Sequence, residues 1–169
     1  FKTGSFGLAN PSILWEQKLN KNISSSFSAE YMYTTGRYKF RYKKIDGYDT
    51  TAIRHNGDVK ALRAEIGLFG LIPDGNWRTR IYAYNSERGY PGAVVKNRFS
   101  NEDRQWDTNF FLQSSFRKKF NTFYSLLLNG KFAYDYLHYL SDQREAESLN
   151  NIDNHYKQQE GYISAANQF

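Results

Sequence analysis

The sequence predicts an all-β protein built as an antiparallel meander of about seven strands. Two observations carry this prediction. Apolar and polar side chains alternate residue by residue in several segments, and successive side chains of a strand point to opposite faces. Turn signals separate these segments, and the connections between them alternate between short and long along the chain.

The alternation is clearest over residues 23–34 and returns over 121–139. In both segments one parity is rich in tyrosine, phenylalanine and leucine, and the other holds serine, asparagine and charged residues. Each strand is therefore predicted to separate an apolar environment from water. We expect the apolar side to hold Phe27, Tyr31, Tyr33, Leu126, Leu128 and Phe132, and the wet side Ser26, Glu30, Asn129 and Lys131.

The predicted strands are 8–19, 23–34, 58–69, 77–86, 105–116, 121–139 and 156–169. Short turns follow at 20–22, 70–76 and 117–121, and long connections at 35–57, 87–104 and 140–155. Antiparallel neighbours place all short turns at one end and all long connections at the other. Asn129-Gly130 is also a hairpin signal, but the parity is the same on both sides of it. We therefore predict a glycine within a strand, with a bulge as one option.

This sorting of connections is typical of outer-membrane barrels, which have short periplasmic turns and longer extracellular loops. The aromatic content of 18% suits the aromatic girdles of such barrels. The mean hydropathy of −0.76 does not argue against a barrel, because positions that face the lumen are polar. No run approaches the roughly 18 apolar residues of a membrane-spanning helix. Two alternatives are a complete small barrel with an adhesive or structural role and a soluble β-sandwich that binds carbohydrate.

The strand count favours an incomplete barrel. Bacterial single-chain barrels close with an even number of strands, and only residues 1–3 precede the glycine-rich turn at 4–7. We therefore expect residues 1–169 to form a single barrel segment that is open at both edges.

Composition excludes several function classes. The net charge of +6 and pI near 9.4 would suit nucleic acid, but the basic residues are spread along the chain and no nucleic-acid-binding motif accompanies them. Cysteine is absent, so thiolate metal sites and cysteine nucleophiles are excluded. His55, His138 and His155 lie far apart in sequence, and no catalytic constellation emerges. The sequence predicts no enzyme, and no cofactor apart from the calcium considered below.

Three segments stand out as a set: TGSFG at 3–7, FSAEYMYTTGRY at 27–38 and YAYNSERGYPG at 82–92. In this order they resemble the start of the barrel in TonB-dependent outer-membrane receptors, most of all the cobalamin-receptor branch. The resemblance covers essentially the whole chain as the first third of a barrel of about twenty-two strands. The family's plug domain and TonB box are not among these residues.

The resemblance implies a receptor in the cell outer membrane that takes up a scarce, bulky nutrient of the corrinoid, haem or siderophore class. Its partners would be the nutrient, outer-membrane lipid and the TonB complex, which acts through a plug that this chain lacks. It would also place a charged wall of the lumen against the plug. That wall would hold Glu30, Arg63, Glu65, Arg78, Arg80, Lys131 and Asp135.

Two sets of loop residues are candidate binding groups. Tyr48, Arg54, His55, Arg88 and Tyr90 are expected at the extracellular mouth, where aromatic and arginine side chains offer large contact area and directional hydrogen bonds. The alternative is that they only pack the loops against one another.

Asp46, Asp49 and Asp58 could supply oxygen ligands to calcium, and the cobalamin branch orders an extracellular loop with calcium. The alternative is that these carboxylates are simply solvated.

Overall fold

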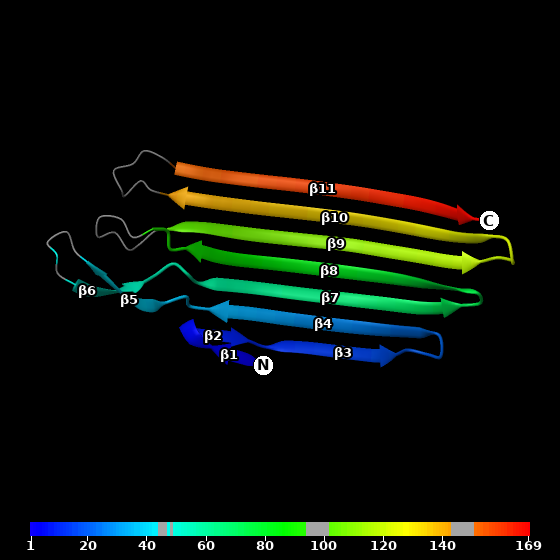
Figure 1. Cartoon of the computed structure of the whole chain (residues 1–169), viewed down its shortest axis with the longest axis horizontal. Coiled ribbons are helices and arrows are strands. Elements are labelled where there is room, and N and C mark those ends of the chain that lie inside the picture. Colours follow the sequence, from blue (N-terminus) through cyan, green and yellow to red (C-terminus); the bar gives the residue numbers. More distant parts are fainter. Residues whose placement is uncertain (44–46, 48, 94–101, 143–150) are drawn as a thin grey trace.

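The computed structural model describes residues 1–43, 47, 49–93, 102–142 and 151–169, and these form an all-β structure (Figure 1). One large antiparallel sheet dominates it, with a small two-stranded hairpin beyond one end. No helix in the described residues is long and apolar enough to cross a membrane.

The sheet runs in the order β1-β2-β4-β7-β8-β9-β10-β11, with β3 also paired to β4. Its strands are β1 (Lys2–Gly4), β2 (Leu8–Asn10), β3 (Ser12–Lys18), β4 (Ile23–Thr34), β7 (Val59–Ile72), β8 (Gly75–Tyr90), β9 (Asp103–Lys119), β10 (Ser125–Asp142) and β11 (Asn151–Gln168). The 3-10 turn η1 (Ser5–Gly7) joins β1 to β2, and β5 (Tyr38–Lys43) pairs with β6 (Asp49–Arg54) as the separate hairpin.

The predicted meander of seven long strands is confirmed with one interruption. The predicted strand 8–19 is divided into β2 and β3, both of which pair with β4. The break falls at Pro11, which has no N–H to donate to a neighbouring strand. Its carbonyl still accepts a hydrogen bond from the Tyr31 N–H at 3.0 Å, so the two pieces follow one line along β4.

All three predicted long connections need correction. Residues 35–57 contain the β5–β6 hairpin, so this connection has structure of its own. The predicted connection 87–104 is shorter, because β8 continues to Tyr90 and β9 begins at Asp103. Cross-strand ion pairs and hydrogen bonds between these polar residues extend the two strands, although the residues lack an alternating apolar pattern. The predicted connection 140–155 is shorter, because β10 continues to Asp142 and β11 begins at Asn151.

The short turns lie at one end of the sheet and the longer connections leave from the other, as predicted (Figure 1). We call these the turn end and the loop end. The tightest turn, at Pro73 and Asp74, needs only two residues because Asp74 takes a left-handed φ of 56°. Asn129-Gly130 lies inside β10 in unbroken register with both neighbours. It is therefore neither a turn nor a bulge.

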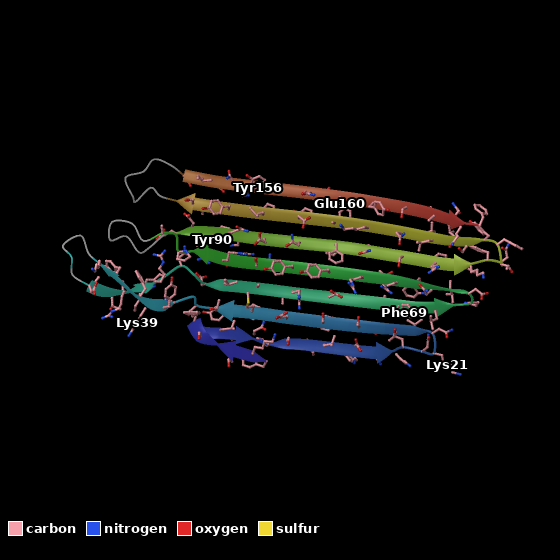
Figure 2. All side chains as sticks on the ribbon, in the orientation of Figure 1. Lys21, Lys39, Phe69, Tyr90, Tyr156 and Glu160 are labelled. Atoms are coloured by element: carbon pink, nitrogen blue, oxygen red, sulfur yellow. The ribbon has the colours of Figure 1, made fainter. Side chains whose placement is uncertain are left out.

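The sheet is a single layer. Ala61 and Ala133 are the only buried hydrophobic residues in the part of the chain that the structure describes. In Figure 2, side chains line the strands along the whole sheet and no other strand lies across it. One edge of the sheet is formed by β1 and β3 and the other by β11, so the sheet is open. This arrangement differs from a sandwich, which would bury one face of the sheet against another.

Candidate functional site on the two faces of the sheet

The register aligns the parities of all strands, so that the sheet has an apolar face and a charged face. Phe27, Ile66, Ile81, Leu112 and Phe132 are neighbours in one row across five strands. We call the face that carries this row the apolar face, and the opposite one the charged face. Each strand of the row contributes a residue from its own alternating pattern, and the pairing joins these patterns into one surface.

An uncharged band crosses the apolar face. On β4, β7, β8, β9 and β10, no charged residue occupies this face between the row of Trp77 and the row of Asn85. Charges appear immediately beyond it, at Lys118 toward the turn end and at Lys60 and Glu87 toward the loop end.

The height of this band fits a membrane. From Trp77 to Asn85 the strand advances about 27 Å, which becomes about 21 Å across a bilayer at a tilt of about 40°. The apolar band of an outer-membrane barrel is roughly 25 Å tall. Only the edge strand β11 brings a charge, Lys157, to the margin of this band.

Four polar side chains within the band are paired with each other. The Thr79 and Ser114 hydroxyls lie 3.0 Å apart, and the Asn85 side-chain amide donates to the Thr108 hydroxyl at 2.9 Å. Such pairing matters in lipid, where no water is available to satisfy a free donor or acceptor.

The charged face carries cross-strand ion pairs over the same height. Arg63 pairs with Glu30 at 2.6 Å, Arg80 with Glu65 at 3.2 Å, and Lys131 with Glu160 at 3.5 Å. Asn109 donates to Asp135 at 2.6 Å. The register places the whole predicted charged wall on this face, with members Glu30, Arg63, Glu65, Arg78, Arg80, Lys131 and Asp135.

Arg88 lies at the loop end of the charged face. It belongs to β8 and not to a loop, and its Nη2 donates to the Asp107 carboxylate at 2.6 Å. Ser86 and Gln105 donate to the same carboxylate at 3.0 and 2.7 Å. Asp107 is therefore saturated with donors, whereas the Nε of Arg88 is buried without a partner among the described residues.

Tyr90 extends this cluster toward the end of β8. Its hydroxyl donates to Gln105 at 2.8 Å, and its ring meets that of Tyr139 edge-on with centroids 6.2 Å apart. The Tyr139 hydroxyl donates to Asp103 at 3.0 Å. We call Arg88, Tyr90, Gln105, Asp107 and Tyr139 the mouth cluster. It brings together two of the predicted ligand-binding residues, Arg88 and Tyr90.

Arg104 forms a second cluster at the loop end, on the border of the apolar face. It binds Asp58 at 2.9 Å and Glu87 at 2.6 Å, and donates to Asn56 at 3.1 Å. The hydrogen bond from Arg104 lowers the pKa of Asp58 below its usual value of 3.8, against the opposing effect of burial. This cluster ties the chain before β7 to β8 and β9.

Of the remaining predicted ligand residues, Arg54 and His55 are not members of the mouth cluster. Arg54 ends β6, is 4% exposed and donates to the carbonyls of Pro91 and Gly92, so it holds the chain that follows β8. His55 is exposed and lines a hollow of about 350 Å³ together with Asp58. Tyr48 lies outside the described residues.

The structure separates two of the three predicted calcium ligands. Asp49 begins β6 and Asp58 follows its end, so the length of the strand lies between them. Asp58 already binds Arg104, and Asp46 lies outside the described residues. The calcium site stays a prediction.

One cluster was missed from the sequence. His138 on β10 pairs in register with His155 on β11, and Asp153 lies beside them, with the three ligand atoms within 4.8 Å of one another. The only sequence signal for this cluster is hairpin symmetry, because residues equally far from the centre of a hairpin face each other, but the sequence does not fix the centre of the connection after β10.

No family model matches this chain, and no curated protein is similar to it.

Proposed function

We propose that this sheet is part of the wall of an outer-membrane β-barrel, with its apolar face toward lipid and its charged face toward the lumen. One observation carries the proposal. An uncharged band crosses one face of the sheet, and ion pairs lie at the same height on the other face. A water-soluble sheet has no need to exclude charge from one face over the thickness of a membrane. A lipid-facing wall does, because an arginine or lysine at the midplane costs about 2–4 kcal/mol.

The three tryptophans offer a direct test, because Trp15, Trp77 and Trp106 all share the apolar face. Trp15 lies in the row at the centre of the uncharged band, Trp77 lies in the row at its turn-end margin, and Trp106 lies one row beyond its loop-end margin. In vesicles with phospholipid brominated at defined depths, single-tryptophan variants should be quenched in that order of depth. Quenching by aqueous iodide alone, at all three positions, would contradict the proposal.

The transport role rests on the resemblance to TonB-dependent receptors together with the charged face. The function we propose is TonB-coupled uptake of a corrinoid, haem or siderophore. The lumenal ion pairs supply the polar wall against which a plug domain would move. The mouth cluster supplies a cation and two tyrosine rings where a ligand would first bind, and no bond of the ligand is made or broken.

Uptake by cells that carry the protein tests this role. Radiolabelled cobalamin, haem and a ferric siderophore should be compared, each with and without a proton-motive-force uncoupler. We expect accumulation of one of the three, abolished by the uncoupler and reduced by Arg88→Ala. Membrane insertion without energy-dependent uptake of any of them would favour a barrel with an adhesive or structural role.

A further inference from the structure

We propose that His138, Asp153 and His155 form a binding site for a divalent transition-metal ion, with Zn²⁺ as the representative ion. The site would join β10 to the edge strand β11 at the loop end of the apolar face. It is independent of the barrel proposal, since it depends only on the pairing of these two strands.

The three side chains already converge. The Nε2 atoms of His138 and His155 lie 2.7 and 3.0 Å from the same carboxylate oxygen of Asp153. All three ligand atoms lie within 4.8 Å of one another. Two ligand atoms of a tetrahedral Zn²⁺ lie about 3.3–3.5 Å apart, so each imidazole would move slightly away from the carboxylate oxygen to admit the ion, and small side-chain movements suffice.

The donor set selects the class of metal. Two imidazoles and one carboxylate suit zinc, copper or nickel, whereas calcium and magnesium prefer oxygen ligands alone. Three protein ligands leave a fourth tetrahedral position for water. His155 and Asp153 are about half exposed, so an ion from solution can reach the site.

Neighbouring side chains hold both imidazoles in place. The Tyr136 hydroxyl lies 2.8 Å from Nδ1 of His155, which leaves Nε2 directed at the site. A hydrogen bond to the second ring nitrogen is the usual way in which proteins orient a metal-binding histidine. His138 is stacked between the rings of His155 and Trp106, with centroids 4.1 and 4.7 Å away.

The position of the site gives the ion a structural role. Every residue of β11 except Ser164 is exposed, and in this structure β11 pairs only with β10. A metal bound by His138 on β10 and by two residues of β11 would cross-link the edge strand to the sheet. We therefore expect Zn²⁺ to raise the thermal stability of the protein.

Isothermal titration of the detergent-solubilised protein with ZnCl₂ tests the site. The variants His138→Asn, His155→Asn and Asp153→Asn should each lower Zn²⁺ affinity by about tenfold or more, and Tyr136→Phe by about tenfold through lost orientation. His55→Asn is the matched control, because it removes a histidine at the same end of the sheet, and its titration should equal that of the wild type.

Electron paramagnetic resonance of bound Cu²⁺ provides a second readout that does not depend on stability. The wild type should show coupling to two imidazole nitrogens, and His138→Asn coupling to one. Zn²⁺ titrations of the three ligand variants that superimpose on the wild type would overturn the proposal. So would binding of Ca²⁺ in preference to Zn²⁺.

Discussion

Ile66 is the position where a charged side chain should be most costly if the apolar face contacts lipid. It lies on the apolar face between Phe27 and Ile81, midway between Trp77 and Asn85 in the uncharged band. An arginine at the bilayer midplane costs about 2–4 kcal/mol, falling to about 0–1 kcal/mol near the interfaces. Ile66→Arg should therefore lower the free energy of unfolding by about 2–4 kcal/mol. Leu128→Arg, at the turn-end margin of the band, should cost less.

Ser28→Arg is the matched control, because it lies on the adjacent strand at nearly the same height but on the charged face, opposite Glu65. We expect it to change stability by less than about 0.5 kcal/mol. Guanidinium titration of the protein refolded into lipid vesicles, followed by tryptophan fluorescence, measures all three variants. Equal costs for Ile66→Arg and Ser28→Arg would refute the assignment of the two faces.

Three further predictions concern the ion pairs and the hairpin. The Glu30–Arg63 pair is partly exposed. A double-mutant cycle with Glu30→Gln and Arg63→Gln should therefore give a coupling energy below about 1 kcal/mol. A coupling energy of several kcal/mol would mean that water is excluded from the charged face. The pKa of Asp58 is lowered by the hydrogen bond from Arg104, so its stabilisation is present above the usual pKa of 3.8 and is lost as pH falls through the lowered value. Asp58→Asn should therefore destabilise the protein at pH 7 but not in strong acid, as unfolding midpoints at the two pH values would show; an equal loss at both would exclude the charge as its cause. Gly36 has a φ of 60°, and a Cβ there would overlap a facing backbone carbonyl. Gly36→Ala should therefore lower the free energy of unfolding by more than about 1 kcal/mol and speed amide hydrogen exchange in the β5–β6 hairpin. Unchanged exchange would show that the hairpin tolerates the strain.

The long strands β4, β7, β9 and β10 could be predicted because apolar and polar side chains alternate along each of them. The alternation at 23–34 fixed both the strand and the face of every residue in β4, and β10 followed in the same way. The strand boundaries at the loop end were harder to predict. Tyr90 and Asp103 are strand residues because their polar side chains and those around them find partners across β8, β9 and β10, and such pairing leaves no periodic pattern in the sequence.

The candidate site, too, could be predicted only in part. Arg88 and Tyr90 were predicted as loop residues, but both belong to β8, where two residues separated by a single position share a face. Arg54 could not be placed, because its burial depends on where the chain after β8 passes. His138 and His155 met only through the register of β10 and β11, which the sequence left open at the connection between them.

Accessibility measured along β10 tests the central claim most directly. The chain contains no cysteine, so single cysteines at each position from 126 to 138 can carry a nitroxide label in vesicles. Collisions with oxygen should peak at Leu128, Phe132 and Tyr134, and collisions with a water-soluble nickel chelate at Asn129, Lys131 and also Leu127. Leu127 separates the effect of the face from that of hydrophobicity, because it is apolar but lies on the charged face. An accessibility profile without a period of two, or with Leu127 in lipid, would contradict a membrane wall with these two faces.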